Sequence, residues 1–165
     1  MLYATLADLV ARFSQRELAQ LTDHDNFPPS EVDTVLVATK LADASVFVDS
    51  YVGQLYRLPL RGCSKPTGVA TSEQVAPPVL TRLTCDLARY YLYSDLAPES
   101  EVYRRYKAAL AELGNIASGQ TLLACPWGGS AGELVAQPDA QSGGAETYSS
   151  FSPRAITDAT LRGFA

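Results

Sequence analysis

The residue types best suited to acid–base or metal chemistry are gathered in one short stretch, residues 23–26 (DHDN). His24 is the only histidine, and a histidine flanked by carboxylates could transfer protons or hold a metal ion. A calcium loop starting at the first aspartate would need glycine sixth and glutamate twelfth, where the chain has Pro28 and Thr34. Because Asp and Asn are strong turn formers, we interpret this stretch as a structural turn without a metal.

The rest of the sequence contains no recognisable motif for nucleophilic catalysis or for phosphate binding. No serine lies in a G-x-S-x-G elbow, and any His-dependent nucleophile would have to recruit His24. The glycine-rich run at 128–132 (GGSAG) lacks the Lys-Ser/Thr pair of a phosphate loop, so a flexible linker is the default interpretation. The sequence therefore predicts a protein that is not an enzyme and uses no cofactor; an enzyme built on residues 23–25 is the alternative.

The three cysteines, Cys63, Cys85 and Cys125, are far apart in the chain. No two of them have the short spacing of a zinc or redox site. Cys85 falls within a helical pattern, where a small buried apolar residue is the expected role. An odd number of scattered cysteines favours synthesis in a reducing cytoplasm, without export.

Length and charge limit the classes of function. A chain of 165 residues suits one compact domain with an appendage. The net charge of -5 and the pI near 4.8 argue against a domain that binds nucleic acid by neutralising phosphates. The N-terminal residues lack the basic start of a signal peptide, and no apolar run is long enough to span a bilayer, so we expect no membrane contact.

The apolar spacing predicts a helical hairpin at about residues 77–118 as the centre of the fold. Apolar and aromatic side chains recur every three or four residues within 80–91 and again within 102–116. Pro98 interrupts the pattern between them. Two apolar stripes joined by a short polar break are typical of antiparallel helices packed face to face.

Helix start and stop signals precede this hairpin. Thr5 can cap a first short helix, and residues 14–17 (SQRE) match a capping box for a second. Residues 30–33 (SEVD) match a weaker box for a third helix, which Gly53 would end. Residues 61–76 show no periodicity and are interpreted as a long exposed loop. We therefore expect an all-α fold, a small helical bundle around the hairpin.

The character of the chain changes after the hairpin. Residues 120–165 are rich in glycine, poor in charge, and carry spaced apolar side chains. This composition fits neither a buried domain nor a charged disordered tail, and it favours an extended arm that orders on a partner. We expect a helical domain at 1–119 and an extended C-terminal arm at 120–165.

Aromatic and basic side chains are the candidates for contact with other proteins. Tyrosines at 90, 91 and 93 point in different directions around one helix, so some of them must face outward, as interface tyrosines do. An ion pair with Glu101 explains part of the basic cluster around Arg105, and docking on an acidic partner is the alternative. The residues expected to contact other proteins are Tyr90, Tyr93, Tyr103, Arg104, Arg105, Trp127, Tyr148, Phe151, Arg154, Leu161, Arg162 and Phe164.

Four blocks of the chain together resemble Mu-like bacteriophage and prophage proteins. The blocks are MLYATLADLVARFSQRELAQLTD, LADASVFVDSYVGQLYRLPL, PPVLTRLTCDLARYYLY and FSPRAITDATLRGF. They cover most of residues 1–119 and return at about 151–164. The chain looks similar to the helical head–tail connector, or adaptor, proteins that form a ring beneath the portal. Residues 61–76 are longer than the link we expect, and residues 123–141 look variable, so interface details are not transferred to them.

The resemblance implies a structural protein of the virion neck, assembled in the host cytoplasm. Copies would form a homo-oligomeric ring, a dodecamer matching the portal. The expected partners are the portal protein, other neck or tail-completion proteins and neighbouring copies, with genomic DNA only as content of the lumen. The alternative from another class is a small cytoplasmic regulatory module that binds a helix or peptide through its tyrosines.

Overall fold

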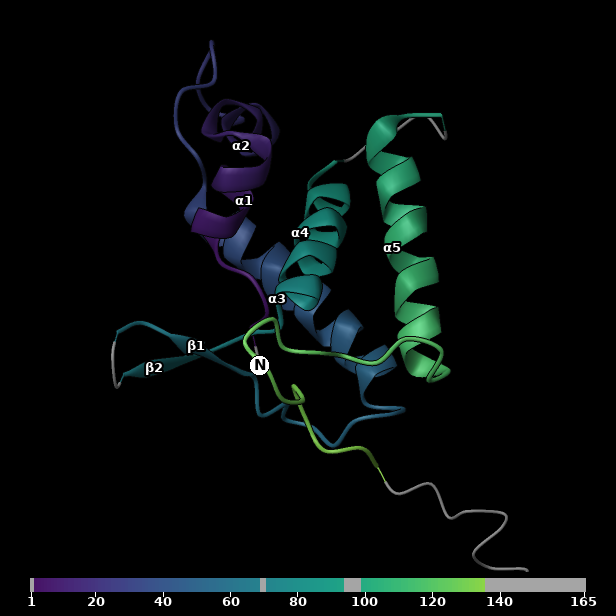
Figure 1. Ribbon diagram of the computed structural model, residues 1–165. Coiled ribbons are helices and arrows are strands. Elements are labelled where there is room, and N and C mark those ends of the chain that lie inside the picture. Colours follow the sequence, from purple (N-terminus) through teal and green to yellow (C-terminus); the bar gives the residue numbers. More distant parts are fainter. Residues whose placement is uncertain (1, 69–70, 94–98, 136–165) are drawn as a thin grey trace, which may run out of the picture. The chain divides into compact units, whose positions relative to one another are not determined.

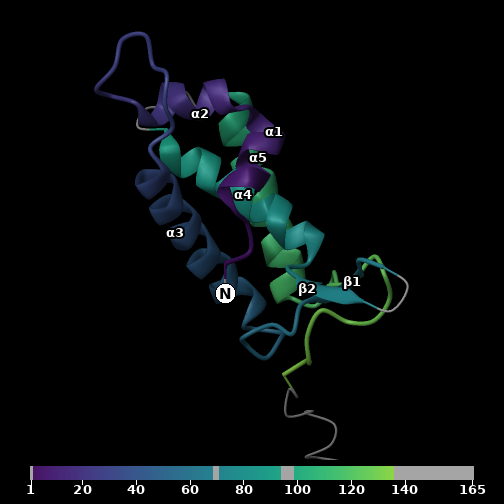
Figure 2. The ribbon, with the colours of Figure 1, turned by 90° about the vertical axis from the view of Figure 1, so that its left-hand side faces the viewer.

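The computed structural model describes residues 2–68, 71–93 and 99–135, which form one compact unit (Figures 1 and 2). Five helices and one two-stranded sheet are present among these residues. In chain order the elements are α1 Leu6–Phe13, α2 Gln15–Thr22, α3 Thr34–Val52, β1 Cys63–Pro66, β2 Ser72–Val75, α4 Pro78–Leu92 and α5 Glu101–Ala117.

Helix α4 is the centre of the core. It contacts α3, α5 and α1, and α4 and α5 run antiparallel side by side (Figure 1). Leu80, Leu83 and Leu87 of α4 have no exposed surface, and Val48 of α3 and Leu113 of α5 are equally buried. The helical hairpin expected at residues 77–118 is therefore confirmed.

The first two helices begin at the expected caps. Thr5 and Asp8 form a reciprocal capping box at the start of α1. The Ser14 hydroxyl accepts a hydrogen bond from the Glu17 amide at the start of α2. The Glu17 carboxylate, however, accepts a 2.7 Å hydrogen bond from Nε of Arg89 on α4. This carboxylate therefore joins α2 to the central helix.

The third helix begins three residues later than the sequence suggests. Asp33, and not Ser30, is its N-cap, because the Asp33 side chain accepts hydrogen bonds from the amides of Val35 and Leu36 in the first turn of α3. Ser30 belongs instead to the turn before it, where its amide donates to Asp23. The backbone amides of Ser30 and Glu31 hold the pKa of Asp23 well below its usual range. The turn expected at residues 23–26 is confirmed, and Gly53 ends α3 as expected.

The expectation of an all-α fold is wrong. Residues 61–76, interpreted as a long exposed loop, contain an antiparallel pair of strands, β1 and β2, so the domain is a mixed α/β one. The pairing places Cys63 opposite Val75, while the other residues of both strands are exposed. Four-residue polar strands have no alternating apolar pattern, which is the signal by which a strand is recognised from sequence.

The segment that follows α5 folds back onto the rest of the unit. Leu123 is buried, and its amide donates a 2.8 Å hydrogen bond to the Tyr56 hydroxyl. The Val135 amide donates a hydrogen bond of the same length to the Leu55 carbonyl. Residues 120–135 thus belong to the compact unit, and the division of the chain into a connector domain and an arm stays a prediction.

The glycine-rich run at 128–132 forms an ordered turn instead of a loose linker. Gly128 and Gly129 adopt positive φ angles of 98° and 82°, which favour glycine. The Cys125 amide donates to the Gly129 carbonyl across this turn. A Cβ atom at Gly132 would lie 2.8 Å from a methyl carbon of Leu60, so a larger residue there would have to displace the Leu60 side chain.

A disulfide joins this turn to the sheet. Cys63 of β1 is bonded to Cys125, with the two Cα atoms 5.4 Å apart. The sequence did not predict the pair, because a separation of 62 residues leaves no spacing signal. Cys85 is buried as expected, and burial raises the pKa of its thiol to about 12.

Candidate protein-interaction surfaces

Four tyrosines form one aromatic cluster on the outside of the helical hairpin. We name Tyr90 and Tyr91 of α4 with Tyr103 and Tyr106 of α5 the tyrosine patch. The Tyr90 and Tyr106 rings are stacked, with centroids 3.9 Å apart and planes at 13°. Four further ring pairs of the patch have centroids 6.1 to 6.5 Å apart. All four residues are half-buried, so each keeps some surface exposed to solvent.

The tyrosine patch continues toward α3. Phe47 and Tyr51 of α3 form an aromatic pair with centroids 5.2 Å apart. Burial raises the pKa of Tyr91 and of Tyr106, and the nearby Tyr51 adds to both shifts. Their hydroxyl groups therefore stay protonated at neutral pH. The surface offers apolar rings with uncharged polar tips, a combination enriched in protein interfaces.

The structure separates the tyrosines that the sequence grouped together. Tyr90 and Tyr103 lie in the tyrosine patch, together with Tyr91 and Tyr106. Tyr93 lies apart, and its hydroxyl donates a 3.1 Å hydrogen bond to the Glu17 carboxylate. Burial first, and then Glu17, raise the pKa of Tyr93. Tyr93 thus helps to hold α2 on α4.

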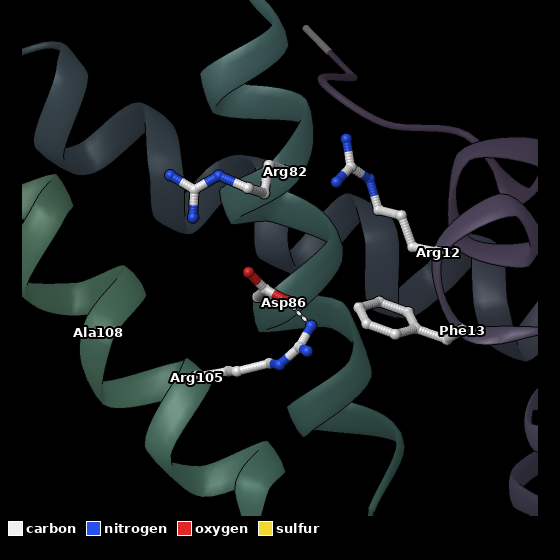
Figure 3. Close-up of a pocket in the computed structure, with 6 residues that line it drawn as sticks. All are labelled: Arg12, Phe13, Arg82, Asp86, Arg105 and Ala108. Carbon is white, nitrogen blue, oxygen red and sulfur yellow. Dashed lines mark ion pairs between the residues drawn. The ribbon is translucent and has the colours of Figure 1, made fainter.

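A second feature, which we name the arginine pocket, opens among α1, α4 and α5 (Figure 3). Its volume is about 310 Å³. Three guanidinium groups from three helices border it, and one carboxylate lies among them (Figure 3). The lining residues are Arg12, Phe13, Arg82, Asp86, Arg105 and Ala108.

Asp86 is the buried charge of the arginine pocket. Asp86 is only 8% exposed, and one of its carboxylate oxygens lies 4.0 Å from Nη1 of Arg105. Burial raises the pKa of Asp86, although Arg105, Arg82 and other arginines oppose the shift. Sequence reasoning missed Asp86, although a carboxylate between Leu83 and Leu87 on an apolar face is a readable signal.

The arginines of the pocket differ in their partners. Arg82 pairs with Glu112, and Arg105 pairs with Glu101 at 2.7 Å, the i,i+4 contact that the sequence predicts. Among the described residues, no carboxylate lies within 4.0 Å of the exposed Arg12 guanidinium. The α1 side of the pocket therefore carries a positive charge with no carboxylate from the described residues close to it.

The Asp86 environment predicts a change in pH dependence for Asp86→Asn. The folded chain holds the Asp86 proton more tightly than the unfolded chain does. Asp86 therefore makes its full contribution to stability at pH values below its pKa in the unfolded chain. That contribution is lost as pH rises through the raised folded pKa. Urea unfolding from pH 3 to 7 should show wild type losing stability relative to the variant as pH rises. Parallel curves would contradict this account of Asp86.

The remaining sequence candidates are exposed or lie outside the described residues. Arg104 is exposed on α5, and Trp127 is 42% exposed in the turn after α5. An apolar groove of about 700 Å³ also lies between α1 and the start of α3. The candidates outside the described residues are Tyr148, Phe151, Arg154, Leu161, Arg162 and Phe164.

Two features are absent from the described part of the chain. No group of three or more His, Cys, Asp or Glu side chains there could hold a metal ion. No helix in that part is long and apolar enough to cross a membrane.

The fold and its surfaces define a small five-helix domain with a disulfide-tied β-hairpin. Residues 3–139 match the family described as Bacteriophage Mu, Gp36, and the chain belongs to this family. The match includes residues 61–76 and nearly all of the 123–141 segment that looked variable. The fourth block of the sequence resemblance, at 151–164, lies beyond it.

Two curated relatives support the same assignment. The chain is 30% identical over 121 residues to Gene product J of Escherichia phage Mu, covering 73% of this chain and 75% of the relative. It is 31% identical over 120 residues to Mu-like prophage FluMu protein gp36 of Haemophilus influenzae, covering 72% and 73%. The chain is thus a protein of the Mu-like phage family, as the sequence resemblance predicts.

Proposed function

We propose that the chain is a structural protein of the virion neck, a head–tail connector that forms a ring between the portal and the next neck or tail component. The observation that carries the proposal is the tyrosine patch. Four half-buried rings on a rigid two-helix support offer a large contact area at little entropic cost. Membership of a phage family provides the setting in which such a surface would contact other virion proteins.

The helices beneath the tyrosine patch hold it on a firmly packed support. Leu83 and Leu87 of α4 are completely buried between the neighbouring helices. The Glu17–Arg89 ion pair adds a link from α2 to α4, with N–O distance 2.6 Å and both side chains mostly covered. A surface held in this way loses little conformational freedom on binding, so more of its contact energy is available for assembly.

A ring of identical copies needs two different faces on each subunit. Such heterologous contacts close when the rotation between neighbours divides a full turn, and a dodecamer would match the portal. If genomic DNA passes through the lumen, the net charge of -5 would keep the wall from trapping it.

The C-terminal residues provide a reach beyond the helical domain in this proposal. The six candidates from Tyr148 to Phe164 would bind the portal or a neighbouring copy as spaced anchors. Neither catalysis, nor a cofactor, nor a membrane has a part in the proposed role. The proposed location is the virion neck, after assembly in the host cytoplasm.

Truncation after residue 147 tests the role of the arm. The truncated chain should keep the helical circular dichroism of the full chain, because the described helices end at Ala117. It should lose co-sedimentation with purified portal rings, because the proposed anchors are removed. A full-length control with Ser149→Ala and Ser150→Ala should bind like the wild type. Undiminished binding of the truncated chain would contradict the role of the arm.

A further inference from the structure

The loop between α2 and α3 presents an aromatic residue to solvent. Phe27 is 100% exposed, and the loop projects beyond the helices (Figure 2, upper left). We name residues 23–29 the Phe27 loop. The Asp23 carboxylate organises it by accepting hydrogen bonds of 2.9 and 3.1 Å from the amides of Ser30 and Glu31. Burying a fully exposed phenylalanine would recover a large apolar contribution to binding.

The Phe27 loop is also acidic at its tip. Asp25 is exposed two residues before Phe27, whereas the Asp23 carboxylate is already occupied by the loop backbone. A partner surface for this loop would therefore combine an apolar floor with a positive charge at its edge. The arginine pocket supplies positive charge, because Arg12 has no close carboxylate among the described residues. Ala108 and the small exposed part of Phe13 add apolar surface to its lining.

We propose that the Phe27 loop of one copy docks in the arginine pocket of a second copy. Asp25 would pair with Arg12, and the Phe27 ring would enter beside Phe13 and Ala108. A pocket of about 310 Å³ lies at the lower end of the size range that accepts small ligands, which suits one aromatic side chain. The inference deepens the proposed function, because it rests on self-assembly and names one subunit contact.

The loop and the pocket are two separate surfaces of one copy. The loop joins α2 to α3, whereas the pocket lies among α1, α4 and α5. A copy can therefore place its loop in one neighbour and receive the loop of another, which is the head-to-tail arrangement of a ring. If the rotation between successive copies divides a full turn, the copies close into a ring.

The apolar groove between α1 and α3 is a poorer receptor for the same loop. Glu31 lines that groove, and Asp33 follows closely in the chain. The Asp25 carboxylate would meet the Glu31 carboxylate there, which opposes docking. The arginine pocket has three arginines beside the single Asp86 carboxylate, so its excess of positive charge favours docking.

A charge exchange tests the contact directly. Sedimentation equilibrium of the full chain at low salt, up to about 1 mM, should show concentration-dependent self-association. Phe27→Ala should weaken it by about 30-fold or more, as expected for an aromatic anchor. Asp25→Arg and Arg12→Glu should each weaken it, and the double variant should regain it because opposite charges meet again. Val46→Ala, an exposed apolar residue on α3, should leave it unchanged.

Each result has a definite meaning. A wild-type chain that stays monomeric up to about 1 mM overturns the contact. A double variant that associates no better than the weaker single variant overturns it as well, provided that circular dichroism shows all variants folded. If the wild type binds portal rings and Phe27→Ala self-associates normally, only this contact is overturned. The proposed function then stands. Self-association through the loop without portal binding would support this contact and contradict the proposed function.

Discussion

Reduction of the Cys63–Cys125 disulfide should lower the free energy of unfolding by about 4 kcal/mol, by the chain-entropy estimate for a closed loop of this length. The bond spans 62 residues and links β1 to the turn after α5. Opening it frees the unfolded chain across α4 and α5 together. Urea unfolding with and without a thiol reductant measures the difference, and deuterium exchange should show the first loss of protection in residues 120–135.

A cysteine-free pair separates the disulfide from other effects of the reductant. Cys63→Ala with Cys125→Ala should already have the lower stability, and reductant should then change nothing further. Cys85 is buried, with a thiol pKa of about 12, so it contributes little to thiol exchange. Wild type whose unfolding is unaffected by reductant would contradict this prediction.

Leu87→Ala should cost about 3 kcal/mol of unfolding free energy, in the middle of the range for buried leucines. Leu87 is completely buried in α4, which contacts three other helices, so the resulting cavity has little freedom to collapse. The tyrosine patch lies on the same helix, and portal binding should therefore weaken near the lowered unfolding temperature. Urea unfolding measures the free energy of unfolding, and thermal unfolding measures the unfolding temperature.

Val79→Ala is the matched control in the same helix. Val79 is 40% exposed, so its truncation should cost under about 1 kcal/mol. Equal losses for the two variants would contradict the assignment of α4 as the central buried helix.

The helical part of the fold was readable from the sequence because its signals are local. Apolar spacing within 80–91 and 102–116 places α4 and α5, and Thr5 caps α1 through a bond to a neighbouring residue. The cap of α3 was misplaced, because Ser30 and Asp33 both carry capping side chains. Asp23, a tertiary partner of the Ser30 amide, decides between them.

The features that were missed depend on contacts between distant residues. The strands β1 and β2 are short and polar, and the disulfide that ties them down joins segments 62 residues apart. The arginine pocket draws Arg12, Arg82 and Arg105 from three helices, so no single stretch of sequence shows it. Only Asp86, a charge within an apolar stripe, could have been singled out in advance.

The interaction residues divide in a similar way. Tyr90 and Tyr103 could be chosen from composition, but the stacking of Tyr90 on Tyr106 requires the packing of α4 against α5. Tyr93 could not be distinguished from them, because its hydrogen bond to Glu17 crosses from α4 to α2. The sequence gives only the average tendency of tyrosine to be exposed, whereas the contacts of each tyrosine depend on its neighbours in the fold.

Electron microscopy of the chain bound to the portal of its own phage tests the connector proposal most directly. The proposal predicts a closed ring of copies against the portal, with the tyrosine patch and the C-terminal residues at contacts between proteins. Each Phe27 loop should then lie at the arginine pocket of the next copy. A chain that stays monomeric and leaves the portal bare, or that is found elsewhere in the virion, would contradict the proposal.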